Sequence, residues 1–270
     1  MHGYALPAMG RAELPGLSLH YEEWGDDAPI LLIAGIPAIA DDWEPVATRL
    51  AGIGRRAIAY DNRGSGTTSA TPGPYTTAQM AADAVALLDY LSIDRADVFG
   101  MSMGGMIAQE LAISHPERVH RLVLGCTHAG IGHAAPAAAA ASRAFALRTD
   151  DWALRMRTLA PFAFSRDVAP SLLEAVIEKK SRDVQDPIGY RAQIDAVLAH
   201  DSEAELSTIR APTLMLTGDD DRIIPGESSE LLAHRIPSAE LRIIRGAGHL
   251  FFLERPDETI EILAGFLGRS

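Results

Sequence analysis

Short apolar runs that alternate with helical patterns constrain the fold of this chain most strongly. Each run ends at Gly, Asp or Pro, where a strand would give way to a loop, and most of the later runs are largely apolar. Such runs are typical of strands buried on both faces of a parallel sheet, with helices as crossovers. The expected strands are 17–24, 30–34, 56–60, 96–100, 121–125, 213–217 and 240–244, and the expected crossover helices are 76–91, 103–114, 227–235 and 257–267. We therefore predict an α/β fold with a mostly parallel central sheet.

One long interval lacks this alternation. Residues 127–210 contain no strand-like run, and helical patterns cover 136–147, 151–159, 171–181 and 187–198. The interval carries 11 acidic and 10 basic residues, so it is nearly neutral within a chain whose net charge is −12. We predict a helical cap over residues 127–210, inserted between a first core part, 1–126, and a second core part, 211–270.

The charge and cysteine content exclude several classes of partner. The excess of 36 Asp and Glu over 24 Lys and Arg repels phosphate backbones and anionic lipids, so neither nucleic acid nor a membrane surface is expected. The longest apolar stretch, 30–40, is shorter than the roughly 20 residues that span a bilayer. The single cysteine, Cys126, cannot form an internal disulfide, and the first sixteen residues lack the pattern of a secretory signal. We expect a cytoplasmic protein.

The most specific local motif is GMSMGG at residues 100–105. It follows the expected strand 96–100 and opens the expected helix 103–114, which is the context that a G-x-S-x-G nucleophile turn requires. The small residues Gly100 and Gly104 leave room for a tight turn that exposes the Ser102 hydroxyl above the sheet. A serine hydroxyl is a weak nucleophile, so this interpretation needs a base and a group that orients the base.

Two downstream motifs follow late strands in the required order. GDDDRIIP at 218–225 comes after the strand 213–217, and GAGH at 246–249 comes after the strand 240–244. With GMSMGG, these motifs resemble the α/β-hydrolase superfamily, in which the order is nucleophile, acid, histidine. The resemblance covers nearly the whole chain and implies that Asp221 is the acid, with Asp219 and Asp220 as alternatives. Of the nine histidines, His249 alone lies in the Gly-rich loop after the last expected strand.

The resemblance also implies where a tetrahedral oxyanion would be bound. One backbone N–H donor follows the nucleophile, at Met103, and a second belongs to the loop after an early strand. The sequence AGIP from Ala34 resembles the H-G-x-P segment of the family, which implies Ile36 as the second donor. Ala34 replaces the histidine of that segment, so the hydrogen bonding of this loop departs from the family pattern.

These motifs predict a serine hydrolase of carboxylic esters or lactones that needs no metal and no organic cofactor. The chain resembles small capped esterases and lactonases, including enol-lactonases and polyketide methylesterases, and a small-molecule ester or lactone is the expected partner. Large apolar side chains of the cap are candidates for the substrate pocket: Trp152, Met156, Phe162 and Tyr190. The motifs leave the oligomeric state open.

Other functions share these motifs. Carbon–carbon bond hydrolases of the fold commonly show GNSMGG, from which Met101 departs, and cofactor-free perhydrolases use the same triad. Some members of the fold are small-molecule-binding proteins without turnover. Ser102 argues against dehalogenases and epoxide hydrolases, which have Asp at the elbow. Cys126 and His128 lie close to the predicted site, but a free cysteine is usually a small buried hydrophobe.

Overall fold

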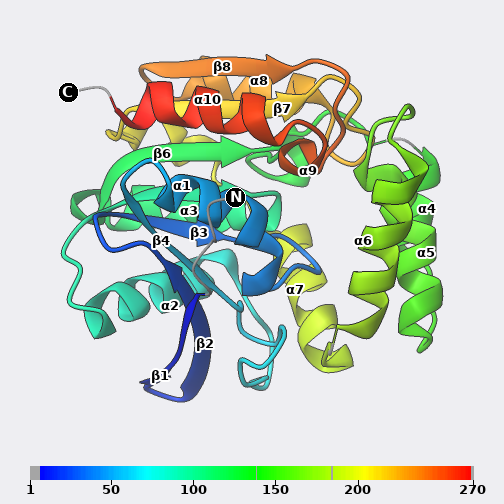
Figure 1. Cartoon of the computed structure of the whole chain (residues 1–270), viewed down its shortest axis with the longest axis horizontal. Helices are drawn as coiled ribbons and strands as arrows, with labels where there is room; N and C mark the ends of the chain where they lie inside the picture. The colour runs from blue at the N-terminus through cyan, green and yellow to red at the C-terminus, as the bar shows by residue number, and fades with distance from the viewer. Residues whose placement is uncertain (1–6, 138, 184, 269–270) are drawn as a thin grey trace.

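A single eight-stranded sheet forms the centre of the molecule (Figure 1). The computed structural model describes residues 7–268 except 138 and 184. The strand order is β1-β2-β4-β3-β5-β6-β7-β8. Strand β2 is antiparallel to both of its neighbours, and the six strands β3 to β8 are parallel to one another. The strands are β1 (Ala8–Leu14), β2 (Leu17–Trp24), β3 (Ala28–Ile33), β4 (Arg55–Tyr60), β5 (Ala96–Met101), β6 (Val119–Gly125), β7 (Thr213–Gly218) and β8 (Ala239–Ile244). The predicted α/β class is confirmed.

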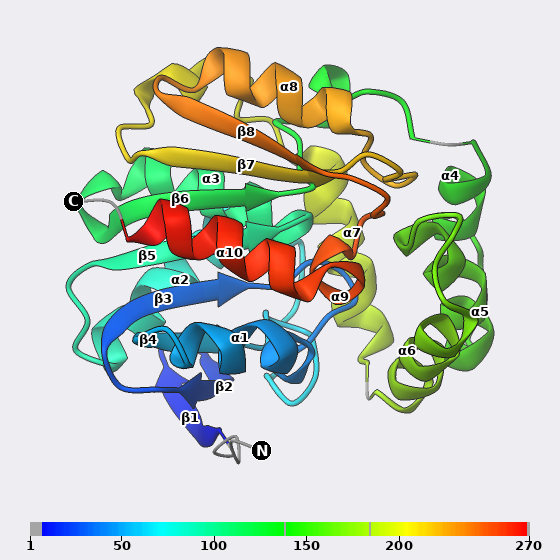
Figure 2. The ribbon, with the colours of Figure 1, turned by 45° about the horizontal axis from the view of Figure 1, so that its top comes forward.

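Helices cover both faces of this sheet (Figure 2). The α-helices are α1 (Glu44–Ala51), α2 (Thr77–Tyr90), α3 (Met103–Ser114), α4 (Ala139–Phe145), α5 (Trp152–Ala163), α6 (Pro170–Arg182), α7 (Pro187–Ala199), α8 (Gly226–Arg235), α9 (Phe251–Glu254) and α10 (Pro256–Leu267). Short 3-10 turns are η1 (Ala40–Trp43), η2 (Pro116–Arg118), η3 (Ile131–His133) and η4 (Glu203–Thr208). The predicted crossover helices correspond to α2, α3, α8 and α10.

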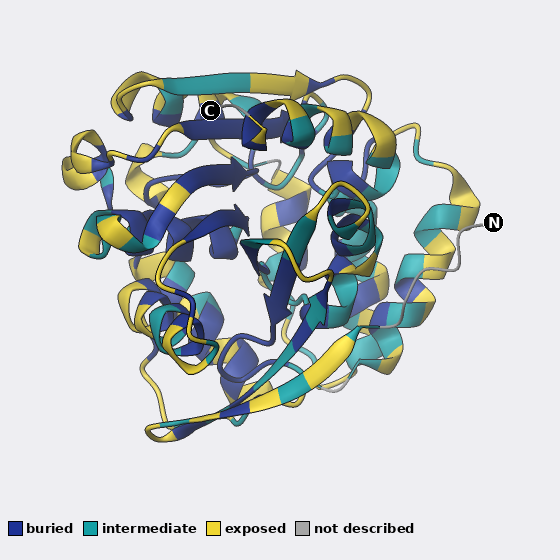
Figure 3. Ribbon diagram, turned by 60° about the vertical axis from the view of Figure 1, so that its left-hand side comes forward, coloured by how far each residue is buried: buried dark blue, intermediate teal, exposed yellow. Residues whose placement is uncertain are grey.

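Alternating residues of the strands feed two apolar layers. Leu31 and Ile33 of β3 belong to the same apolar cluster as residues of α2, α3 and α8. Ile30 and Leu32 belong to the cluster on the other face, with residues of α1, α9 and α10. Because successive side chains point to opposite faces, a strand covered on both sides must be apolar at every position. Figure 3 shows these strands as the buried centre of the molecule. This double coverage explains why continuous apolar runs predicted the strands.

Three elements of the core were not predicted: β1, α1 and the four-residue helix α9. β1 pairs with β2 at the edge of the sheet, and only Ala12 of its residues is buried, so it has no apolar run to reveal it. Figure 3 shows exposed positions along this strand. Helix α1 has only eight residues and begins with Glu44-Pro45, so its helical pattern is too short to predict it.

The described part of the interval between β6 and β7 contains helices α4 to α7, here called the cap helices. They lie beyond the end of the sheet at which the parallel strands finish (Figures 1 and 2). Helices α4 and α5 have an apolar cluster of their own, formed by Ala144, Met156 and Leu159. Helix α7 instead contributes Ala192 and Ala196 to the main core.

Some sequence-based expectations fall on residues outside the described ranges. The expected helix 136–147 contains residue 138 and is observed as α4 from Ala139 onward. The first sixteen residues, which lack the pattern of a secretory signal, include residues 1–6 outside the described ranges. Among the residues that the structure does describe, none of the helices has the length and apolar character needed to cross a bilayer.

Candidate active site

The carboxyl ends of β5, β6, β7 and β8 lie side by side, and the loops that leave them carry the predicted site residues. Ser102 stands alone between the end of β5 and the start of α3. Its backbone has φ 55° and ψ −120°, a conformation that non-glycine residues rarely adopt and that the surroundings must impose. The Ser102 carbonyl accepts hydrogen bonds from the Gly105 amide at 2.9 Å and from Thr127 Oγ1 at 2.8 Å. These contacts hold the turn in its strained form.

Close backbone packing explains the glycines of the GMSMGG motif. A Cβ atom on Gly104 would lie 2.0 Å from the carbonyl oxygen of Ile33, and one on Gly100 would lie 2.2 Å from the carbonyl oxygen of Gly104. Gly35 packs directly against Ser102, because a Cβ atom there would lie 2.8 Å from the serine Cβ. The turn that carries Ser102 therefore abuts the loop that leaves β3.

The acid and the histidine meet across two neighbouring loops. Asp221 follows β7 and His249 follows β8, and His249 Nδ1 lies 2.7 Å from Asp221 Oδ2. The other carboxylate oxygen accepts from the backbone amides of Ile223 at 2.8 Å and Ile224 at 2.9 Å. Since an ionised carboxylate only accepts, Nδ1 carries the proton and Nε2 presents a lone pair. The imidazole is thus held in the tautomer of a general base.

The two neighbouring aspartates have other partners. Asp219 Oδ1 accepts from the Gly246 amide at 2.7 Å, and Asp220 Oδ2 accepts from the Arg166 amide at 2.6 Å. Of the three consecutive carboxylates, the structure places only Asp221 against His249.

Sequence reasoning missed one residue that holds the histidine loop. Glu254 Oε1 accepts from the amide of Gly248, beside His249, at 2.7 Å, and Glu254 Oε2 accepts from Ser165 Oγ at 2.5 Å. The link joins the loop after β8 to the end of α5. Nothing in the sequence identifies this role, because Glu254 ends an apolar helical turn and its second partner, Ser165, lies 89 positions away.

The loop after β3, residues 34–40 and here called the β3 loop, is fixed at both ends. Asn62 Nδ2 donates to the Ala34 carbonyl at 2.9 Å, and Asp61 Oδ1 accepts from the Ala40 amide at 2.8 Å. A side chain from another loop thus anchors the segment that lacks the histidine of H-G-x-P. Within the described ranges, the amides of Ile36 and Met103 have no hydrogen-bond acceptor, so both are available to bind an anionic oxygen.

Comparison with known proteins shows the family of this chain. The model of the α/β-hydrolase fold family matches residues 28–256. The chain belongs to this family. The 3-oxoadipate enol-lactonase 2 of Acinetobacter baylyi is 32% identical over 204 residues, which cover 74% of this chain and 73% of the relative. The crystal structure of the enol-lactonase from Burkholderia xenovorans LB400 superposes with a TM-score of 0.85 and 29% identity, covering 96% of this chain and 100% of the other.

A third relative of this α/β hydrolase is named for a different reaction. The 2-hydroxymuconate semialdehyde hydrolase of Pseudomonas putida is 30% identical over 275 residues, covering 98% of this chain and 96% of the relative. The chain is accordingly an enzyme of the α/β-hydrolase family with lactonase and other hydrolase relatives.

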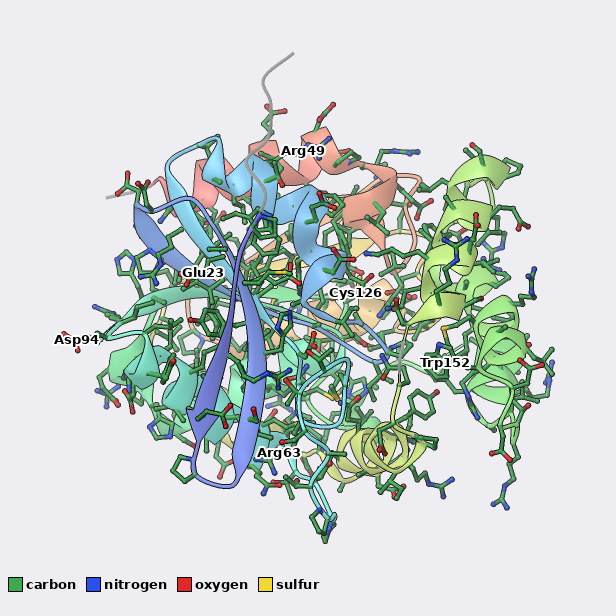
Figure 4. The ribbon with its side chains drawn as sticks, turned by 60° about the horizontal axis from the view of Figure 1, so that its bottom comes forward. Glu23, Arg49, Arg63, Asp94, Cys126 and Trp152 are labelled. Atoms are coloured by element: carbon green, nitrogen blue, oxygen red, sulfur yellow. The ribbon has the colours of Figure 1, made fainter. Side chains whose placement is uncertain are left out.

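Cys126 lies beside the candidate active site, but its surroundings do not favour a nucleophilic thiolate. Its Sγ atom lies within 4.8 Å of ligating atoms of Asp221 and His249, and the residue is fully buried (Figure 4). Burial raises the pKa of the Cys126 thiol well above its usual range, and the adjacent Asp221 carboxylate raises it further. A protonated thiol is a poor nucleophile, so this environment does not favour Cys126 as the attacking group.

His128, two residues further on, makes the stability of this hydrolase depend on pH. Burial lowers its pKa to about 4, with a smaller contribution from His200. The unfolded chain binds this proton near pH 6.5, so stability is fully present above that pH and is lost as the pH falls toward 4. We expect the free energy of unfolding to drop by about 2 kcal/mol between pH 7 and pH 5 from this group.

Urea unfolding of wild type and His128→Asn at both pH values measures this loss. The variant should lose correspondingly less stability on acidification, whatever its stability at pH 7. Equal losses in the two proteins would show that His128 does not titrate as described.

The predicted pocket residues fall into two groups. Met156 packs into the apolar cluster of the cap helices and is 3% exposed. Trp152 and Tyr190 meet edge to face with ring centroids 5.5 Å apart, and the Arg222 guanidinium lies over the Phe162 ring at 5.3 Å. Trp152, labelled in Figure 4, is the first residue of α5. A contact of these four side chains with substrate stays a prediction.

Proposed function

We propose that this protein hydrolyses carboxylic esters or lactones through an acyl-enzyme on Ser102. His249 Nε2 takes the hydroxyl proton as Ser102 Oγ attacks the acyl carbon, and the amides of Ile36 and Met103 bind the resulting oxyanion. His249 then gives its proton to the leaving oxygen, which departs as an alcohol or, from a lactone, remains attached to the acyl group. Water, deprotonated by His249, releases the acid and restores Ser102.

One observation carries this proposal. The 2.7 Å contact between His249 Nδ1 and Asp221 Oδ2 sets the tautomer and stabilises the imidazolium that forms during attack. The strained turn after β5, two strands from β7 in the same sheet, supplies the nucleophile. The packing of Gly35 against Ser102 brings the Ile36 amide to the same region. The enol-lactonase relative supports the choice of esters and lactones.

The cap favours a small, weakly charged substrate in this proposal. Trp152, Phe162 and Tyr190 offer apolar surface, and the interval 127–210 carries 11 acidic and 10 basic residues, which suits a neutral ester better than a polyanion. We place the reaction in the cytoplasm, because a chain with one cysteine has no internal disulfide to gain from an oxidising compartment.

Hydrolysis of a carbon–carbon bond is a second candidate, favoured by the similarity to the 2-hydroxymuconate semialdehyde hydrolase. The same three side chains would serve, but the leaving group would be a carbanion that must be protonated at carbon. Ester hydrolysis is preferred because the leaving oxygen needs only the proton that His249 already carries.

Initial rates on p-nitrophenyl esters from acetate to long acyl chains test the proposal. We expect turnover that peaks at short or middle chains, because the cap side chains proposed to contact the substrate would limit the length of the acyl group. Lactones should be hydrolysed by the same site, and an ester at saturating concentration should inhibit their turnover competitively. Absence of ester and lactone turnover in the folded protein, with cleavage of a vinylogous 1,5-diketone, would establish the second candidate instead.

A further inference from the structure

A buried ion cluster connects the cap to the β3 loop. It consists of Asp42 on the core side and of Lys180 and Asp183 on the cap side, and we call it the α6 ion cluster. Lys180 Nζ lies 2.6 Å from Asp42 Oδ2 and also pairs with Asp183. The Lys180 side chain is 10% exposed and that of Asp183 9% exposed, so the charges have lost most of their water.

Burial makes this cluster costly unless it is fully paired. Desolvation would raise the pKa of Asp42, but Lys180 and then Lys179 outweigh it and hold the pKa below its usual range. Lys179 Nζ approaches Asp42 Oδ1 at 3.0 Å from a half-exposed position at the rim. Without Lys180, Asp183 would lose its ion-pair partner and Asp42 would keep only the half-exposed Lys179, so the position of Asp42 depends on Lys180.

Asp42 also holds the backbone of the β3 loop. The same oxygen that receives Lys180, Oδ2, accepts from the amide of Ile39 at 2.9 Å. Ile39 is three residues after Ile36. Asn62 and Asp61 anchor the ends of the loop from the core side, whereas Asp42 anchors its interior. The loop interior also has backbone bonds from the Ala38 amide to the Gly35 carbonyl at 2.9 Å and from the Asp42 amide to the Ile39 carbonyl at 3.1 Å. Gln185 Nε2 makes a long contact with the Pro37 carbonyl at 3.4 Å.

We propose that Lys180 is a positioning residue for the β3 loop, through which helix α6 of the cap fixes the Ile36 amide toward the oxyanion. Lys180 acts through Asp42 and does not touch the substrate. The inference rests on the proposed function, because it assigns the amide of Ile36 to transition-state binding. An oxyanion donor is effective only when it is fixed before the reaction begins. Loosening the donor therefore weakens binding of the transition state more than it weakens binding of the ester.

Replacing Lys180 with methionine tests this role, because methionine keeps much of the side-chain volume and removes the charge. We expect kcat for p-nitrophenyl butyrate to fall about ten-fold or more, with KM changed less than two-fold, since complete loss of one oxyanion donor costs on the order of 10²-fold or more. The inhibition constant of an aryl trifluoromethyl ketone, which adds to the serine as an oxyanion, should rise by a similar factor. Lys180→Arg, which keeps the charge, should recover part of kcat.

Arg182→Met is the matched control on the same helix. Arg182 is 75% exposed and pairs with Glu178 on the same helix, so its loss should leave kcat and the inhibition constant unchanged. Asp42→Asn keeps an acceptor for Ile39 but loses the charge, so it tests the same link if Lys180→Met does not fold. Its effect on kcat should be similar, and Lys180→Met should add little to it.

The outcomes separate the two proposals. If wild type hydrolyses the ester and Ser102→Ala does not, the proposed function stands. Unchanged kcat and inhibition constant in Lys180→Met or Asp42→Asn, even with a lower melting temperature, would then overturn the positioning role. If wild type and Ser102→Ala are equally inactive toward esters and lactones, the proposed function fails first and the inference falls with it.

Discussion

Ser102→Ala is expected to lower kcat/KM for p-nitrophenyl ester hydrolysis by on the order of 10³-fold or more. The variant loses the only atom that can form the acyl-enzyme, and water attacking in its place lacks the serine's fixed position. The strained turn should persist, because alanine keeps the Cβ and the carbonyl that accepts from Gly105 and Thr127. Initial rates at several ester concentrations, with protein concentration set by absorbance, measure the loss.

Ser171→Ala, at an exposed position at the start of α6, is the matched control and should retain wild-type rates. His249→Ala should cost about as much as Ser102→Ala, and combining the two should add little, because members of a triad act as a unit. Circular dichroism and the melting temperature establish that each variant is folded. Ordinary ester turnover in folded Ser102→Ala would rule out a serine acyl-enzyme.

The parts of this structure that the sequence predicts are those that depend on neighbouring residues or on burial at every position of a strand. β3 is apolar throughout and β7 carries three consecutive apolar residues, Leu214 to Leu216, because helices cover both faces of these strands. The Ser102 turn is recognisable because its strand, its glycines and its helix are adjacent in the chain. β1 escaped prediction because an edge strand with one buried residue carries no such pattern.

Contacts between distant segments were beyond sequence reasoning. Asp42 and Lys180 are 138 positions apart, and each on its own is typical of a solvated surface charge. The sequence alone could not choose among Asp219, Asp220 and Asp221, so the choice depended on family resemblance. The backbone of the loop after β7 determines which carboxylate points toward His249. The Asn62 anchor on Ala34 likewise joins two loops whose partnership no local motif records.

Asp221→Asn should lower kcat by about 10³- to 10⁴-fold while the fold is kept. The amides of Ile223 and Ile224 both donate to Oδ1, so the asparagine must place its oxygen there and its amino group toward His249. That amino group donates to Nδ1 and forces the ring proton onto Nε2, which can then no longer accept the proton of Ser102. Measurement of kcat with p-nitrophenyl butyrate at pH 7.5 gives the size of the effect.

The adjacent carboxylates provide the matched controls for this prediction. Asp219→Asn keeps an acceptor for the Gly246 amide, and Asp220→Asn keeps one for the Arg166 amide, so both should retain kcat within about three-fold. Because each carboxylate is held by a contact away from His249, neither can replace Asp221 when its charge is removed. If Asp221→Asn retained most of its activity and lost it only when Asp219 or Asp220 was also changed, the acid would be shared among the three residues and the fixed-tautomer argument would be wrong.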